Sequence, residues 1–215
     1  MNLNKYKTLI FDCDGVVLDS NKVKSDAFYK AALPYGEDAA NALLEYHKNT
    51  GGVSRYKKFR YFLDTIVENE LENFGYDVLL ELYASEVMDG MLTCNVAENI
   101  DKLREETKDT KWLIVSGGDQ EELRDIFKQR KLDTLFDGGI FGSPDTKEVI
   151  LEREISNSNI QLPALFLGDS KYDRKASLSS ELDFIFISDW TEVNDWVSWT
   201  KTYDILSRET LNDFL

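Results

Sequence analysis

Short unbroken runs of apolar residues recur along the chain, and residues that favour turns flank each of them. They lie at residues 8–11, 112–115, 164–167 and 184–187. Runs of this length without polar alternation are typical of parallel strands covered on both faces. Between them lie helical patterns such as residues 119–131, with an apolar face and acidic residues in the first turn. The alternation of strand and helix predicts an α/β fold with a doubly wound parallel sheet.

One long interruption separates the first two predicted strands. A simple crossover needs far fewer residues than this interval contains, and its pattern is largely helical, punctuated by glycines. The predicted helices span residues 25–33, 38–47, 56–69 and 78–88. We therefore predict an inserted α-helical cap at residues 22–95 and a core made of residues 1–21 and 96–215.

Charge and composition exclude several classes of protein. The chain of 215 residues carries 25 Lys and Arg against 40 Asp and Glu, a net charge of -15 that would repel a nucleic acid backbone. It has neither a secretory signal pattern nor an apolar run of the roughly 18 residues that a membrane span needs. Cys13 and Cys94 lie far apart and suggest neither a disulfide framework nor a zinc site. We expect a cytoplasmic protein, monomeric or homodimeric, with no nucleic acid or membrane partner.

Acidic and small polar residues follow the predicted strands. Asp12 and Asp14 come directly after the first strand, a Ser-Gly-Gly-Asp stretch at 116–119 follows the second, and Gly-Asp-Ser-Lys-Tyr-Asp at 168–173 follows the third. In open parallel sheets the ligand crevice lies at the carboxyl ends of the strands. These side chains are therefore expected to converge.

Converging carboxylates need a positive charge among them. Two unit charges about 4 Å apart repel by on the order of 4 kcal/mol at an effective dielectric of 20. Carboxylate oxygens with no histidine or thiolate nearby favour Mg²⁺, which often bridges carboxylates to a substrate phosphate. The sequence therefore predicts a magnesium site that involves Asp12, Asp14, Asp169 and Asp173.

The spacing of the first two aspartates suits phosphoryl transfer. One aspartate can attack a phosphoryl group as a nucleophile, and a second, two positions later, can give a proton to the leaving oxygen. Gly15 allows the backbone to turn away directly afterwards.

Four stretches together resemble the motifs of the haloacid dehalogenase-like hydrolase superfamily. They are Asp-Cys-Asp-Gly-Val-Val-Leu-Asp-Ser at 12–20, Leu-Ile-Val-Ser-Gly-Gly at 113–118, Gly-Ser-Pro-Asp-Thr-Lys at 142–147 and Leu-Gly-Asp-Ser-Lys-Tyr-Asp at 167–173. Any one of them would be a weak signal, but four in order are specific. The resemblance implies a phosphatase, or a relative in the β-phosphoglucomutase branch, with a helical cap over the active site.

The resemblance also implies a role for each motif residue. Asp12 would be the nucleophile that forms an aspartyl phosphate, and Asp14 the general acid and then the base. Asp169 would hold Mg²⁺ with Asp12 and the backbone carbonyl of Asp14, while Asp173 would support the metal shell or orient Lys147. Ser116 and Lys147 would hold the phosphoryl oxygens. Gly117 would also contact the substrate.

The predicted cap contains a stretch of basic residues without any acid. It spans residues 47–61 and holds Lys48, Arg55, Lys57, Lys58 and Arg60. A solvated helix face would explain it. The Gly-Val-Ser-Arg segment that ends at Arg55, however, resembles the specificity loop of sugar-phosphate mutases, where an arginine binds the distal anionic group of the substrate. We predict Arg55 and Lys58 as substrate contacts, and a sugar phosphate or sugar-acid phosphate as substrate.

Several alternatives stay open at this point. A phosphosugar mutase would use the same aspartates, and a phosphonate-cleaving relative would need a Schiff-base lysine, for which Lys22, Lys24 and Lys30 are available. A receiver-like phosphoacceptor or a non-catalytic binding protein is a further possibility. We interpret His47 as a polar cap or loop residue, and Asp19 and Ser20 as caps of the first cap helix.

Overall fold

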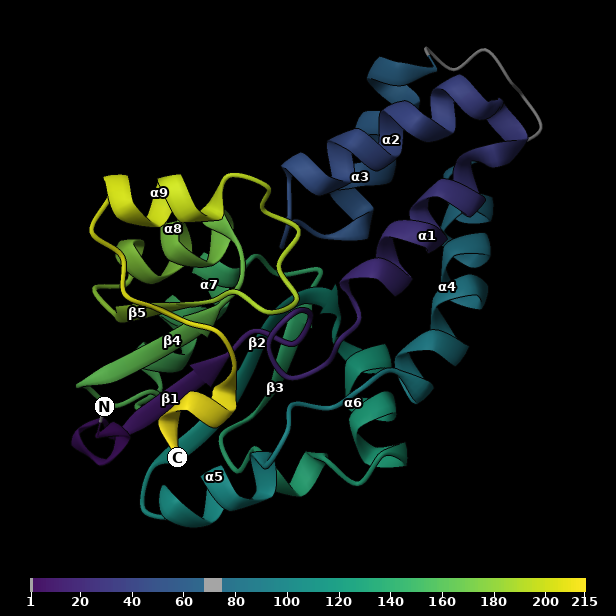
Figure 1. Cartoon of the computed structure of the whole chain (residues 1–215). Coiled ribbons are helices and arrows are strands. Elements are labelled where there is room, and N and C mark those ends of the chain that lie inside the picture. The colour runs from purple at the N-terminus through teal and green to yellow at the C-terminus, as the bar shows by residue number, and fades with distance from the viewer. Residues whose placement is uncertain (1, 68–74) are drawn as a thin grey trace.

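The computed structural model describes residues 2–67 and 75–215 and shows a six-stranded sheet with helices on both faces (Figure 1). Neighbouring strands are all parallel, and their order is β3-β2-β1-β4-β5-β6. The strands are β1 (Thr8–Phe11), β2 (Lys111–Asp119), β3 (Gly139–Ser143), β4 (Ala164–Gly168), β5 (Asp183–Ile187) and β6 (Ser207–Arg208). The predicted doubly wound α/β fold is thus confirmed.

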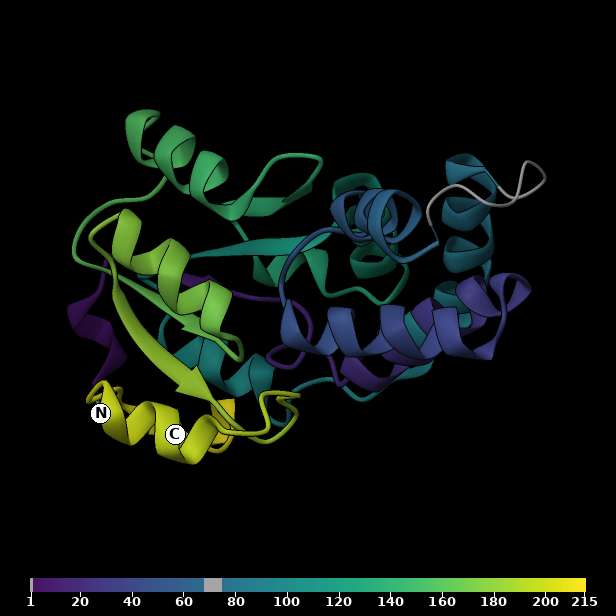
Figure 2. The same ribbon diagram turned by 90° about the horizontal axis from the view of Figure 1, so that it is seen from above.

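Alternate residues of each central strand pack on opposite faces of the sheet. Leu9 and Phe11 of β1 belong to the apolar cluster that includes residues of α5 and α6, whereas Ile10 packs with α7 and α8. Figure 2 shows these two helical layers from above. The core helices are α5 (Ile100–Glu106), α6 (Gln120–Gln129), α7 (Lys147–Ser156), α8 (Lys171–Ser179) and α9 (Trp196–Thr202).

A helical insertion lies between β1 and β2, as the sequence predicts. It contains α1 (Asn21–Ala32), α2 (Glu37–Asn49), α3 (Arg55–Tyr61), which continues as a π-helix (Phe62–Ile66), and α4 (Tyr76–Thr93). The last residues of the predicted helix 56–69 lie outside the described part of the chain. The insertion sits beside the carboxyl ends of the strands (Figure 1). We call it the cap; its predicted domain boundaries stay a prediction.

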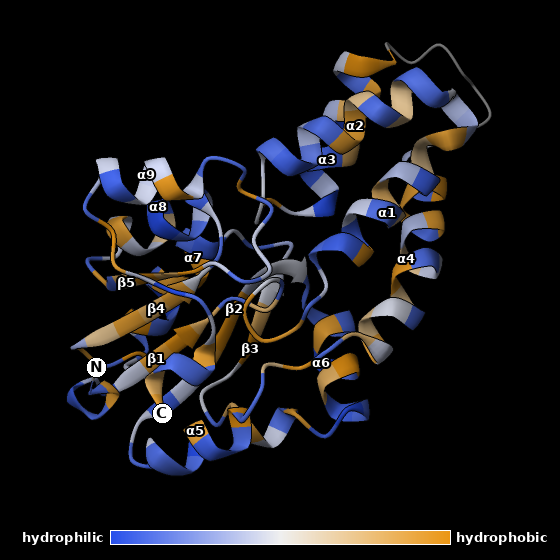
Figure 3. Ribbon diagram, viewed as in Figure 1, coloured by the Kyte–Doolittle hydropathy of each residue, from blue (hydrophilic) through white to orange (hydrophobic). Residues whose placement is uncertain are grey.

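The apolar core is continuous between the sheet and the cap. One cluster of buried side chains includes Phe11 and Trp112 of the sheet together with Phe28, Phe59 and Tyr83 of the cap. Figure 3 shows this distribution, with hydrophobic residues concentrated on the strands and polar residues on the outer helices. Among the described residues, no helix combines the length and the apolar character that crossing a membrane requires.

Some local predictions were wrong. β2 extends to Asp119, whose side chain caps α6 by accepting a hydrogen bond from the Glu122 amide, so the helix begins one residue later than its pattern indicates. Ser20 precedes α1, but its hydroxyl makes no capping bond and donates to Asp14 instead. The Asp19 carboxylate accepts a hydrogen bond from Asn95. Neither residue therefore caps the first cap helix through its side chain.

Candidate active site

Three buried aspartates meet at the carboxyl ends of β1 and β4. Asp12 follows β1, while Asp169 and Asp173 follow β4 on either side of the start of α8. One oxygen from each carboxylate lies within 4.8 Å of the others. The spacing and the oxygen donors fit a hard divalent cation, which carboxylates hold at short range. The structure thus brings together three of the residues that the sequence predicts as metal ligands.

The backbone at Gly15 allows this convergence. Gly15 adopts a φ of +76°, and a Cβ atom there would lie 2.1 Å from the Asp169 Oδ2 atom. Any other residue would be strained at this φ and would also displace the carboxylate. The turn after Asp14 therefore requires glycine because a metal-ligand candidate lies directly against it.

Asp173 is fixed by the start of its own helix. Its Oδ2 atom accepts hydrogen bonds from the Ser170 amide at 3.0 Å and the Ser170 hydroxyl at 2.6 Å, while the same hydroxyl accepts from the Asp173 amide. This reciprocal arrangement is a capping box. It leaves the Oδ1 atom free to contact Lys147.

Lys147 bridges two of the aspartates. Its Nζ atom lies 2.9 Å from Asp12 Oδ2 and 2.5 Å from Asp173 Oδ1, and its side chain is fully buried. Burial alone would lower the pKa of Lys147, but the charges of the two carboxylates raise it, so the lysine is protonated. Lys147 thus serves as a permanent buried cation beside the predicted nucleophile.

One lysine does not balance three carboxylates. Burial, reinforced by the charge of Asp173, raises the pKa of Asp12 to about 7. Burial and then the charges of Asp12 and Asp173 raise the pKa of Asp169 well above its usual value. A divalent cation would stabilise the ionised form of all three. The electrostatics of the cluster therefore fit the metal site that the sequence predicts.

Asp14 has different neighbours from Asp12, although only one residue separates them. Its carboxylate accepts hydrogen bonds from Lys24 at 2.5 Å and from Ser20 at 2.6 Å. Burial raises its pKa, but the Lys24 charge and hydrogen bonds outweigh burial, so the pKa falls below its usual value. The carboxylate stands outside the cluster of three aspartates. The metal contact predicted for its backbone carbonyl stays a prediction.

Ser116 and the glycines after it have separate positions. The Ser116 hydroxyl is fully buried and accepts a hydrogen bond from the Gly118 amide at 3.0 Å. Gly117 and Gly118 line the cavity next to the aspartates. A Cβ atom on Gly117 would lie 2.1 Å from the Gly52 carbonyl oxygen of the cap. Gly117 is therefore where the cap backbone approaches the sheet, and the phosphate contact predicted for Ser116 stays a prediction.

Arg55 links the cap to the core. Its two terminal nitrogens donate to both oxygens of Glu122 on α6, at 2.9 and 2.6 Å, and its guanidinium lies over the Tyr83 ring. Next to it, the Tyr56 hydroxyl donates to Asp119 at 2.7 Å. Arg55 lines the cavity, but both terminal nitrogens of its guanidinium bind Glu122. The substrate contact predicted for Arg55 stays a prediction.

His47 and Lys58 form a buried pair on the cap side of the cavity. His47 belongs to the last turn of α2 and is only 7% exposed, so its interpretation as a cap or loop residue was wrong. Its Nδ1 atom lies 2.7 Å from Lys58 Nζ. Burial and then the charge of Lys58 lower the pKa of His47 well below its usual value, so the ring is neutral.

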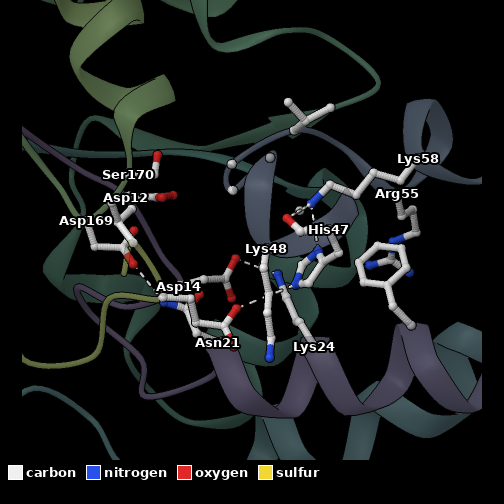
Figure 4. Close-up of a pocket in the computed structure, with 18 of the residues that line it drawn as sticks. Asp12, Asp14, Asn21, Lys24, His47, Lys48, Arg55, Lys58, Asp169 and Ser170 are labelled. Carbon is white, nitrogen blue, oxygen red and sulfur yellow. Dashed lines mark hydrogen bonds and ion pairs between the residues drawn. The ribbon is translucent and has the colours of Figure 1, made fainter. Parts of the chain in front are cut away.

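A single cavity contains both the aspartates and the cap residues. Figure 4 shows Asp12 and Asp169 on one side and His47, Arg55 and Lys58 on the other. Glycines 51, 52, 117 and 118 line the same cavity. The aspartates of the core and the basic residues of the cap therefore face the same cavity.

The sequence did not point to some of the residues that complete the site. The Asn21 amide nitrogen donates to Asp169 at 2.7 Å and to the Trp190 carbonyl at 2.8 Å. Glu192 accepts from the Ser25 hydroxyl and lies 3.8 Å from His47 Nε2. Asn21 is the first residue of α1 and directly follows the first motif. This position was the only feature of the sequence that could have pointed to its role. Glu192 reaches the site from a loop far along the chain, which no local pattern indicates.

Comparison with known proteins agrees with this geometry. A model of the family described as haloacid dehalogenase-like hydrolase matches residues 9–187. No curated protein matches the chain.

Solved structures share the whole fold at low sequence identity. A predicted phosphatase from Clostridium acetobutylicum is 19% identical, with 97% of this chain and 95% of that one covered and a TM-score of 0.74. A β-phosphoglucomutase from Clostridium difficile is 17% identical, with 97% and 93% covered and a TM-score of 0.73. A haloacid dehalogenase-like family hydrolase from Streptococcus pneumoniae is 18% identical, with 98% of each chain covered and a TM-score of 0.64.

At these identities the solved structures show only that the fold is shared. The family match covers most of the chain and includes β1 and β4, which the aspartates follow. With its buried aspartates at the ends of β1 and β4, the chain belongs to the haloacid dehalogenase-like hydrolases.

Proposed function

We propose that the protein is a magnesium-dependent phosphatase that hydrolyses a small phosphorylated metabolite, a sugar phosphate or sugar-acid phosphate, through an aspartyl phosphate on Asp12. The observation that carries this proposal is the set of contacts around Asp12. Its carboxylate lies at a strand end between a buried lysine and two further aspartates, and it faces a cavity. The family match and the fold shared with a predicted phosphatase support it.

Two contacts fix the position of the Asp12 carboxylate. Its Oδ1 atom accepts a hydrogen bond from the Cys13 amide at 2.7 Å, and its Oδ2 atom contacts Lys147. In the first step an Asp12 oxygen bonds to phosphorus, the bond to the leaving oxygen breaks, and that oxygen takes a proton. In the second step water attacks the phosphorus of the aspartyl phosphate, which frees phosphate and restores the carboxylate.

Asp14 and Lys24 handle the protons in this proposal. The Lys24 ammonium donates to the ionised Asp14 at 2.5 Å, and in the first step one proton passes from Lys24 through the Asp14 carboxylate to the leaving oxygen. Asp14 is held in its ionised form, as a base that accepts the proton of the attacking water requires. Asp14 then passes the proton of the water back to Lys24, so the pair ends the cycle with the proton that it gave up in the first step.

A bound Mg²⁺ would be held by Asp12 and Asp169, with Asp173 in support, and would neutralise the charge of the phosphoryl group. The chain's own residues still position the reaction. Lys147 supplies a fixed positive charge next to Asp12, and Gly117 and Gly118 line the cavity beside it. The cap excludes bulk water from the site.

Phosphate release tests this function. A panel of sugar phosphates, sugar-acid phosphates and nucleotides is incubated with the protein in Mg²⁺ or in EDTA. We expect at least one compound to be hydrolysed in Mg²⁺ and the rate to fall by at least about a hundred-fold in EDTA, because the carboxylate cluster needs a cation to accept a phosphate dianion. Transfer of phosphate between sugar positions without release would instead indicate a phosphosugar mutase.

A further inference from the structure

Lys58 is a buried lysine on the cap side of the cavity. The residue is 1% exposed, and among the residues that the structure describes it forms no ion pair with a carboxylate. Its Nζ atom has one short hydrogen bond, to His47 Nδ1, and a longer contact of 3.5 Å to the His47 carbonyl. Its remaining surroundings include the Phe28 ring, whose centroid lies 5.2 Å away.

The other buried cations at the cavity differ from Lys58. Lys24 contacts Asp14 at 2.5 Å, and Arg55 contacts Glu122 at 2.6 Å. Lys48 also lines the cavity but is partly exposed, so water can solvate it. Burial, aided by the charge of Lys24, lowers the pKa of Lys58 to about 7. A buried ammonium in this state is stabilised by any anion that comes within hydrogen-bonding distance.

His47 orients the Lys58 amine. The neutral ring accepts from Lys58 through Nδ1, so its proton is on Nε2, which faces Glu192 at 3.8 Å. Glu192 is itself held by the Ser25 hydroxyl at 2.8 Å. One hydrogen of the ammonium is directed at the ring and a second at the His47 carbonyl, which leaves one for a ligand.

Lys58 also lies in the right place for a substrate. It lines the same cavity as Asp12 and Asp169, on the opposite, cap side (Figure 4). A phosphoryl group at the aspartates would leave the rest of the molecule pointing toward the cap. The substrate atoms that approach Lys58 are thus those farthest from the reacting phosphorus.

We infer that the substrate is a phosphomonoester with a second anionic group, a carboxylate or a second phosphate, and that Lys58, oriented by His47, binds this group. The inference rests on the proposed function and narrows its substrate class. Arg55 is not needed for the contact, since Glu122 occupies its guanidinium. Lys58 is thus a specificity residue and takes no part in the chemistry.

Matched pairs of phosphate esters test the inference. 3-Phosphoglycerate is compared with glycerol 3-phosphate, which lacks the carboxylate, and fructose 1,6-bisphosphate with fructose 1-phosphate, which lacks the second phosphate. We expect the wild-type kcat/KM to favour the doubly anionic member of at least one pair by about 10-fold or more, as a charge-assisted hydrogen bond provides. The pair that shows the preference identifies the anionic group.

Variants of Lys58 separate recognition from chemistry. Lys58→Met fills similar space without the amine and is expected to abolish the preference through KM, with kcat changed by less than about twofold. Lys58→Arg keeps the charge and is expected to retain a preference. Lys57→Met, at the exposed neighbouring lysine, is the matched control and should behave as wild type. An undiminished preference in Lys58→Met, or equal loss for both members of a pair, would overturn the inference.

Direct binding distinguishes this inference from the proposed function. Calorimetric titration of Asp12→Asn with the same compounds measures recognition without turnover. Tighter binding of a doubly anionic compound that disappears in Asp12→Asn/Lys58→Met supports the anion site even if the wild type releases no phosphate, in which case only the hydrolytic function fails. Equal binding of both members in every pair would show that the inference is wrong even if hydrolysis is observed.

Discussion

Replacement of Asp12 by asparagine is expected to reduce phosphate release by at least about a thousand-fold, since a carboxamide cannot form the aspartyl phosphate. The change is nearly isosteric, and the amide oxygen can still accept the hydrogen bond from the Cys13 amide. Folding should therefore be retained. The measurement is kcat in Mg²⁺ with the best substrate of the panel.

Asp109→Asn is the control for this variant. Asp109 is exposed and lies far from the cavity in the loop before β2. The same chemical change there should leave kcat within about twofold of wild type. If Asp12→Asn kept more than about a tenth of the wild-type kcat while Asp109→Asn was unaffected, Asp12 would not be the nucleophile.

Replacement of Lys147 by methionine is expected to impair both stability and activity. The variant leaves Asp12 and Asp173 buried beside Asp169 without their protein cation. Breaking a buried ion pair costs about 3 to 5 kcal/mol in the free energy of unfolding. The loss should be largest in EDTA, and Mg²⁺ should recover part of it, because a metal that binds only the folded cluster stabilises it.

Urea denaturation of Lys147→Met in EDTA and in Mg²⁺ checks the stability prediction. The kcat of the same variant should fall by at least about a hundred-fold, because the fixed positive charge beside Asp12 is lost. Lys102→Met on the exposed side of α5 is the control and should change the free energy of unfolding by less than about 0.5 kcal/mol. A Lys147→Met protein as stable in EDTA as wild type would show that the cluster does not depend on the lysine charge.

Much of the core could be predicted because its signals are local. The apolar runs of β1 and β4 are buried on both faces, and the aspartates follow their ends. Parallel pairing then brings Asp12 and Asp169 together without further information. β3 was missed because Gly139–Ser143 is short and has glycine in two of its five positions, so its apolar content is low.

The cap side could not be predicted because its contacts join residues that no sequence pattern relates. Arg55 pairs with Glu122 across the boundary between cap and core. His47 and Lys58 meet only because α2 and α3 pack together, and a lone histidine gives no sign of a buried partner. Ser20 has a residue type and position typical of a helix cap, yet Asp14 offers its hydroxyl a stronger, charged acceptor.

The most direct test of the proposed mechanism is mass spectrometry of the wild-type protein after acid quenching during turnover with substrate and Mg²⁺. The account predicts a phosphoryl group on the peptide that contains Asp12, absent when EDTA replaces Mg²⁺. Phosphate release with no phosphorylated Asp12 peptide at any quench time, in a protein whose other peptides are all recovered, would contradict it and would indicate direct attack of water on the substrate.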